Sequence, residues 1–205
     1  MKFLPAYRRL VDGLGPAVGN RLATLAVCLK APYFLTIRPL ILSLAPGDVS
    51  IHMPDSWLVH NHLATTHAIA QCNLIELAMG LMAEASVPDH LRWIPMGMDV
   101  SYQRPAKGAL VARATLSALG EAQTGPSAAD GRTDGHAGED AAAASDPAQH
   151  FMLDSYPGTV VVPVSVRDAH GEQVSAATVR LWITERAPTP SLGEGPSFRP
   201  SAGSS

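Results

Sequence analysis

The chain is poor in cysteine and has little excess charge of either sign. Its 205 residues include two cysteines, Cys28 and Cys72, in separate apolar stretches. These predict two buried thiols rather than a disulfide or a metal centre, and the cytoplasm is the expected compartment. The formal net charge is −3, and no basic block or aromatic-rich basic patch is present. Nucleic acid is therefore not an expected partner.

Long hydrophobic runs are also missing. The most apolar window, residues 68–83, contains Gln71, Asn73 and Glu76 and is shorter than the roughly 20 residues that cross a bilayer. No membrane span is expected. The N-terminus is basic, but Asp12, two glycines and a proline interrupt the apolar segment next to it, which argues against a secretory signal.

The length and an apolar fraction of 46% suit one domain with a sizeable core and some additions. Residues 1–33 are predicted to form an N-terminal helical extension, kinked near residues 13–16, where glycines precede a proline. Residues 34–186 are predicted to form the main domain. Within it, residues 120–150 are almost without large apolar side chains, and a disordered insertion is expected at about residues 120–156. Residues 187–205 are expected to be a disordered tail.

The first half of the main domain is predicted to contain two strands and a long helix. Residues 34–44 predict a strand with a bulge or edge position at Pro39, and residues 49–53 predict a second strand. The helix is expected from about residue 67 to residue 86, with Thr65 or Thr66 as its cap.

The second half is predicted to consist of strands. Residues 93–103 and 108–119 are separated by a turn signal, and the second of these segments alternates between apolar and polar side chains. Residues 159–168 place four valines on one face, and residues 174–185 form the last strand. This order predicts an α+β fold, in which an antiparallel sheet packs against one central helix.

The central helix carries the most informative residue of the sequence. Its segment is almost wholly apolar and is expected to be buried, yet Glu76 lies near its middle. A carboxylate in such a helix must be paired, protonated or functional. Pairing with Arg92, Arg104 or Arg113 would make Glu76 structural. The alternative is a catalytic acid or base.

Polar residues gather just before and within this helix. Three histidines, His60, His62 and His67, would suggest zinc, but no cysteine or carboxylate completes a ligand set, so no metal site is expected. His67 is either a structural histidine or a catalytic one. Asn73 precedes Glu76 by about one helical turn and would either orient its carboxylate or satisfy a backbone group. Trp57 would cover a ligand or fix the loop.

The spacing of Asn61, His67 and Glu76 resembles that of the acyl-CoA thioesterases of the hotdog fold. Within that superfamily, the chain is most similar to the phenylacetyl-CoA and hydroxybenzoyl-CoA thioesterase type, in a branch with an additional N-terminal helix. The turn Tyr-Gln-Arg-Pro-Ala at residues 102–106 supports the resemblance independently. The similarity covers residues 34–186 without the insertion.

The resemblance implies a sheet wrapped around the central helix and a homodimer, alone or as half of a dimer of dimers, with active sites at the subunit interface. The substrate would be an acyl-CoA or another acyl thioester, with no cofactor beyond coenzyme A in the substrate. Glu76 would be the nucleophile or general base, and the N–H of Ala68 would polarise the thioester carbonyl, as helix N-termini can. Asn61 would contact the thioester oxygen or orient water, and His67 would shape the start of the helix. The residues expected to contact substrate are Asn73, Gly80, Trp57 and Tyr102.

Two departures from the family pattern favour a second hypothesis. The usual His-Gly-Gly is replaced by His67, Ala68 and Ile69, which adds side chains where substrate approaches the backbone. Gly80 stands where many relatives carry a serine or threonine that holds water. The alternative is therefore a non-catalytic hotdog protein that binds acyl-CoA or acyl chains. A hydratase-type site would need a different Asp/His pairing at the helix start.

Overall fold

The computed structural model describes residues 3–116 and 157–186. In chain order, the elements are α1 (Phe3–Lys30), η1 (Pro32–Ile37), β1 (Leu40–Ala45), β2 (Asp48–Met53), η2 (Trp57–Val59), α2 (Ala68–Ser86), β3 (Leu91–Tyr102), β4 (Leu110–Thr115), β5 (Gly158–Asp168) and β6 (Gln173–Glu185). The expected insertion at residues 120–156 and the expected tail at residues 187–205 lie outside the described residues.

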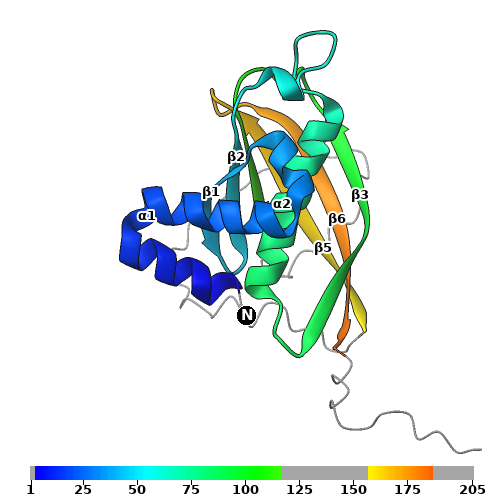
Figure 1. Ribbon diagram of the computed structural model, residues 1–205. Coiled ribbons are helices and arrows are strands. Elements are labelled where there is room, and N and C mark those ends of the chain that lie inside the picture. Colours follow the sequence, from blue (N-terminus) through cyan, green and yellow to red (C-terminus); the bar gives the residue numbers. More distant parts are fainter. Residues whose placement is uncertain (1–2, 117–156, 187–205) are drawn as a thin grey trace, which may run out of the picture.

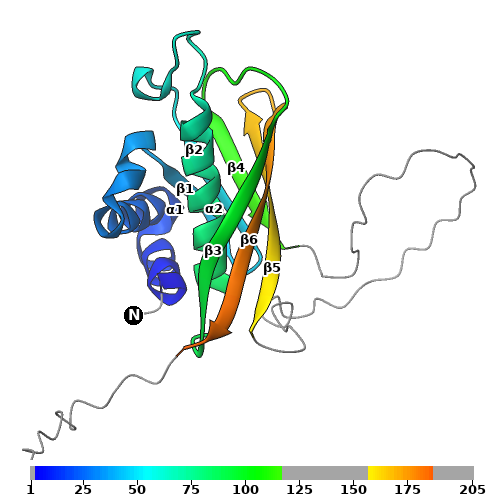
Figure 2. The same ribbon diagram turned by 90° about the vertical axis from the view of Figure 1, so that its right-hand side faces the viewer.

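One six-stranded antiparallel sheet curves around α2 in the order β1-β2-β4-β5-β6-β3 (Figure 1). Seen from the side, α2 lies between the sheet and α1, which packs on the face of α2 away from β5 and β6 (Figure 2). This arrangement confirms the predicted α+β class and is the hotdog fold that the resemblance implies.

The strands that cover α2 follow the predicted alternation. Buried side chains recur at every second residue of β4 and β5, as a half-buried strand requires. They are Leu110, Ala112 and Ala114 on β4, and Val160, Val162, Val164 and Val166 on β5. Pro163 lies one residue beyond the last β4–β5 pair, Ala114 with Val164. The proline therefore falls where that hydrogen-bond ladder ends.

The strand predicted for residues 34–44 is wrong in its first half. Residues 34–37 belong to the 3-10 helix η1, which begins at Pro32, and proline at a first helical position is well tolerated. Arg38 then takes a left-handed conformation with φ 47°, and β1 starts only after Pro39. The bulge lies between Ile41 and Ser43 rather than at the proline.

The predicted kink divides α1 into two helical halves. Gly15 has φ 76° and ψ 160°, outside the helical region, and Pro16 begins the second half. The halves fold back closely, since a Cβ on Gly19 would lie 2.7 Å from Cα of Val11 and 2.8 Å from the carbonyl group of Leu10. Only glycine allows this approach without a backbone shift.

Side chains of α1 cover the outer edge of the sheet at β1. Thr24 Oγ1 accepts the N–H of Ile41 at 3.0 Å, and Asn20 Nδ2 donates to the carbonyl of Leu42 at 3.1 Å. Tyr7 from the first half of α1 donates its hydroxyl to Asn20 Oδ1 at 2.9 Å. Both halves of α1 are thereby connected to the free edge of β1, which would otherwise present unpaired backbone groups.

The opposite edge, β3, has no such cover in the described part of the chain. It exposes 49% of Ile94 and 60% of Met96. Its pairing with β6 is interrupted by a bulge between Pro95 and Gly97, which tends to bend a strand locally. In the described ranges, no helix is long and apolar enough to span a membrane.

We predict that Gly19→Ala destabilises the fold by about 1–3 kcal/mol, because the added Cβ forces the halves of α1 apart. Thermal unfolding of the two proteins measures the effect as a lower Tm. The matched control is Gly13→Ala, where a Cβ meets nothing within 4 Å and alanine favours the helix. Equal melting temperatures for both variants would contradict the close approach at Gly19.

Candidate functional site

The first turn of α2 is capped by His67 rather than by Thr65 or Thr66. The N-cap residue is His67, and its ring Nδ1 accepts the backbone N–H of Ile69 at 3.1 Å. This ring nitrogen is therefore unprotonated in the capped helix. The backbone N–H of His67 donates to the carbonyl of Val59 at 2.7 Å, while Thr66 is buried beneath the turn. The sequence missed the cap because histidine is not a common N-cap residue.

One backbone N–H group in the first turn of α2 has no hydrogen-bond acceptor among the described residues. The N–H groups of Ala70 and Gln71 donate to the carbonyl of His67 at 3.0 and 3.2 Å, and that of Ile69 donates to the His67 ring. Within residues 3–116 and 157–186, the N–H of Ala68 has no acceptor. An unpaired N–H at the positive end of a 19-residue helix is a ready donor to an anion.

Asn61 orders the loop that leads into this turn. Its Oδ1 accepts the N–H groups of Leu63 at 2.9 Å and Thr65 at 3.2 Å, and its Nδ2 donates to Thr65 Oγ1 at 2.9 Å. The backbone N–H of Asn61 also donates to the carbonyl of Thr65 at 2.8 Å. In this arrangement the Asn61 amide holds its own loop closed.

Tyr102 connects the end of β3 to the same first turn. Its hydroxyl lies 3.0 Å from Cys72 Sγ and donates to the carbonyl of Ala68 at 3.3 Å. Burial, followed by the contact with Cys72, raises the pKa of Tyr102 to about 12, so the hydroxyl stays protonated near neutral pH. The sequence indicated Tyr102 but not Cys72, because thirty positions separate the two residues.

Glu76 is exposed in the single chain, which corrects the expectation of burial. The sheet, η1 and α1 cover the other faces of α2, but the stripe that carries Glu76 is left open. Two of the arginines considered as its partners are used elsewhere: Arg104 pairs with Glu172 at 2.8 Å, and Arg113 pairs with Asp48 at 2.7 Å. Among the described residues, Glu76 has no ion-pair partner.

Two cavities meet at Glu76. The larger, of about 610 Å³, lies between α1 and α2 and includes Gly80 in its wall. The smaller, of about 230 Å³, lies between α2 and the bulged part of β3, beside Met96 and Gly97. An unpaired carboxylate at the junction of two largely apolar cavities is a candidate acid, base or nucleophile.

The remaining predicted substrate residues are dispersed. Trp57 is 80% exposed on η2, so its ring packs little against the described residues. Asn73 is buried and points to η1 rather than to Glu76, since its Nδ2 donates to Thr36 Oγ1 at 3.1 Å. Its Oδ1 has no partner among the described residues, and the residue lines a small cavity of about 170 Å³ with His60 and His67.

The two candidate catalytic groups are far apart within one chain. Ala68 and Glu76 are eight residues apart on α2, and a rise of 1.5 Å per residue separates them by roughly 12 Å along the helix axis. A thioester carbonyl is polarised only by a donor at hydrogen-bond distance. One chain therefore does not bring both groups to the same carbonyl.

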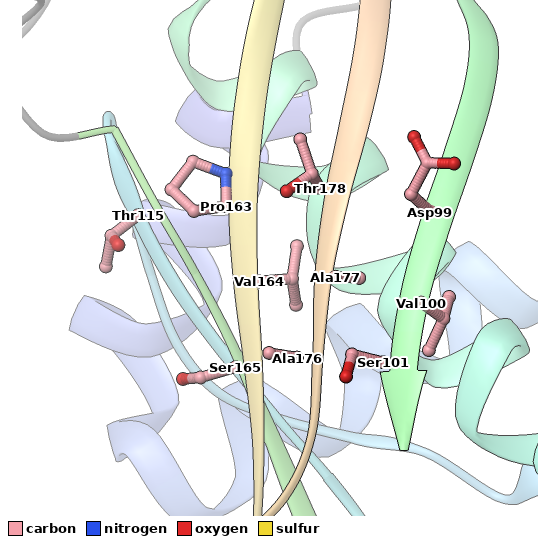
Figure 3. A pocket seen from close by; sticks show the side chains of 10 residues that line it. All are labelled: Asp99, Val100, Ser101, Thr115, Pro163, Val164, Ser165, Ala176, Ala177 and Thr178. Atoms are coloured by element: carbon pink, nitrogen blue, oxygen red, sulfur yellow. The ribbon is translucent and has the colours of Figure 1, made fainter. Parts of the chain in front are cut away.

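A further hollow, of about 500 Å³, lies on the outer face of the sheet and is lined mostly by small side chains (Figure 3). Its carboxylate, Asp99, pairs with Arg180. The hollow therefore offers no unpaired titratable group in the described part of the chain. No group of three or more His, Cys, Asp or Glu side chains there could hold a metal ion.

Solved structures with this arrangement include proteins named for thioester chemistry. The crystal structure of a genomics target is 28% identical to this chain, with a TM-score of 0.62 over 90% of this chain and 99% of the other. A Pseudomonas aeruginosa protein named as a probable thioesterase is 19% identical, with a TM-score of 0.58 over 77% and 89%. The phenylacetic acid degradation protein PaaI of Thermus thermophilus is 17% identical, with a TM-score of 0.50 over 74% and 97%. The second and third of these structures are less than 25% identical to this chain, and their similarity shows a shared hotdog fold alone.

No curated protein matches the chain. A protein family does match, however, over residues 19–183, which span most of the second half of α1 and nearly the whole sheet. In this chain, the matched domain has the hotdog fold. The chain therefore belongs to the DUF4442 family, which is described as a domain of unknown function.

Proposed function

We propose that this protein is an acyl thioesterase whose active site is completed by two copies of the chain. The N–H of Ala68 of one copy binds the thioester oxygen, and Glu76 of the other copy acts as general base or nucleophile. Glu76 either takes a proton from the attacking water or attacks the carbonyl carbon itself. In the first case, the C–S bond breaks as the tetrahedral adduct collapses, and the proton held by Glu76 passes to the departing thiolate. In the second case, the attack expels the thiolate and leaves a mixed anhydride, which water then hydrolyses to the free acid and the Glu76 carboxylate.

The observation that carries the proposal is the unpaired N–H of Ala68 at the start of α2. His67 caps the following N–H and fixes the turn, so the Ala68 donor is preorganised and needs no rearrangement when negative charge develops on the oxygen. Tyr102 supports the same turn from β3 through the carbonyl of Ala68. Asn61 orders the preceding loop and acts as a positioning residue.

The exposed edge of β3 supports the proposed homodimer. A long edge strand with exposed Ile94 and Met96 is a template for pairing with another strand. A second copy related by two-fold symmetry would present the same strand in the opposite direction. Such pairing joins the two sheets and brings further cover to the open stripe of α2. The 12 Å separation within one chain then no longer prevents the donor and the carboxylate from sharing a carbonyl.

We predict that Glu76→Gln lowers kcat/KM for acyl-CoA hydrolysis at least about a hundredfold, because the amide can neither accept the proton nor attack. Release of free thiol from acyl-CoA measures the rate, and thermal unfolding confirms that the variant is folded. The matched control is Glu185→Gln, which neutralises an exposed carboxylate at the end of β6. An unchanged rate in the folded Glu76→Gln variant would rule out the assigned role.

Ala68→Pro removes the N–H group while leaving the helix start in place. Proline is favoured at the first helical position, and His67 already has the extended conformation, φ −59° and ψ 138°, that a following proline requires. We expect kcat to fall about 10²–10³-fold with little change in Tm. Ala68→Gly, which keeps the N–H, is the control. If the proline variant hydrolyses thioesters as fast as the glycine variant, the backbone donor is not used.

Mixing the two inactive variants tests the shared site directly. Dimers of Glu76→Gln or of Ala68→Pro alone each lack one group in both sites. When the two chains are unfolded and refolded together, half of the dimers are mixed and each has one complete site. We expect roughly a quarter of wild-type activity in the mixture. No recovery, although mixed dimers are detected by mass spectrometry, would mean that each site uses groups of one chain.

The second candidate is a protein that binds acyl-CoA without hydrolysing it. It is favoured by the exposed side chain of Ile69, which stands beside the donor where the family pattern has glycine. Absence of hydrolysis across short, long and aromatic acyl-CoAs, together with a Tm raised by one of them, would support this candidate.

A further inference from the structure

The larger cavity at Glu76 lies between α1 and α2, and Phe34 of η1 and Trp93 of β3 also line it. Both halves of α1 contribute, with Phe3 and Leu10 from the first half and Val27 from the second. α2 supplies the opposite wall and lies beside α1 (Figure 2). The cavity encloses about 610 Å³, within the usual range of small-molecule sites.

The wall on α2 is long and has no side chain at its middle residue, Gly80. Glu76, Gly80 and Glu84 all line the cavity and follow one another at intervals of four residues, which places them along one row of the helix. This cavity stripe shares only Glu76 with the open stripe of Ile69, Cys72 and Glu76. The cavity stripe is roughly 12 Å long at 1.5 Å per residue. Gly80 at its middle has no side chain, and a Cβ there would approach only the Trp93 ring, at 3.6 Å.

Charge is confined to the two ends of this stripe and to the rim. The charged side chains in the lining are Glu76, Glu84 and Lys30, all exposed, and the remaining lining is almost entirely apolar. The Tyr7 hydroxyl, the other titratable group of the lining, is already bonded to Asn20 at 2.9 Å. Burial raises the pKa of Tyr7, so it remains neutral. The interior therefore suits a long, uncharged ligand.

We propose that this cavity holds an aliphatic acyl chain, which runs from Glu76 along α2 beneath α1. The proposal rests on the proposed function for the position of the thioester carbonyl, and it makes medium- to long-chain acyl thioesters the substrate class. A compact aromatic acyl group would leave most of the stripe unfilled. Each methylene that enters the cavity is expected to raise kcat/KM about fourfold until the cavity is full.

Two substitutions that shorten the cavity from opposite walls test this. Ala26→Trp adds bulk from α1 at an exposed lining position, and Gly80→Leu adds bulk from α2 at the middle of the stripe. We expect each to lower the ratio of kcat/KM for dodecanoyl-CoA to that for butanoyl-CoA at least tenfold. Leu25→Trp is the control, since Leu25 is 50% exposed on the same helix and does not line the cavity. It should leave the ratio unchanged.

If the ratio of kcat/KM for dodecanoyl-CoA to that for butanoyl-CoA is unchanged in both folded cavity variants, the acyl-chain proposal is overturned. The proposed thioesterase function would not be affected by that result. A wild-type preference for phenylacetyl-CoA over dodecanoyl-CoA would also overturn the acyl-chain proposal. If wild type hydrolyses no thioester, the cavity is tested by calorimetric binding of dodecanoate and butanoate. Dodecanoate should bind wild type and Leu25→Trp more tightly than butanoate does, and this difference should be lost in Ala26→Trp and Gly80→Leu. That result would support the acyl-chain site even though the proposed function had failed. Equal affinity of dodecanoate for wild type, Ala26→Trp, Gly80→Leu and Leu25→Trp would overturn the proposal.

Discussion

The need to cover α2 determines most of this structure. A helix that is apolar around most of its circumference is stable in water only when nearly every side is packed. The curved sheet covers one side, and η1 with α1 covers another (Figure 2). The stripe that remains open contains Ile69, Cys72 and Glu76. The candidate chemistry lies on this stripe because it is the part of α2 that a ligand or a second chain can still reach.

Side chains of α1 cover one edge strand of the sheet, β1, whereas the other edge strand, β3, is open among the described residues. This difference relates the N-terminal helix to the proposed dimer. At β1, Asn20 and Thr24 of α1 bond the backbone groups that a neighbouring strand would otherwise occupy. At β3, nothing in the described residues does so. In the proposed homodimer, pairing with a second copy is therefore expected at β3. The same contacts that close β1 also hold α1 above α2, so the cavity at Glu76 depends on them.

The sequence predicted the parts of the fold that are set locally. Alternation identified the inner strands, and glycines before Pro16 located the kink of α1. The cap of α2 was missed because a histidine ring took a role more usual for threonine. Residues 34–37 became a 3-10 helix because Pro32 starts one and Arg38 turns the chain before β1.

Less of the site could be predicted in this way. The sequence proposes Glu76 and Ala68 as site residues from the spacing of Asn61, His67 and Glu76, and their roles stay predictions. The exposure of Glu76 was not predictable, because apolar composition does not indicate which faces of a helix are covered. The contact of Cys72 with Tyr102 joins α2 to β3, and the large cavity joins α1 to α2. Both depend on tertiary packing that no local pattern encodes.

The absence of glycine after His67 has a smaller consequence than the family pattern implies. The proposed donor is the backbone N–H of Ala68, a group that every residue except proline provides. What the site requires is that this N–H stays unpaired while its neighbours are satisfied. His67 meets that requirement by accepting the next N–H on its ring and two further ones on its carbonyl. In the proposed thioesterase, replacing glycine by Ala68 and Ile69 therefore changes which acyl groups approach, while the geometry of the helix start keeps the proposed donor.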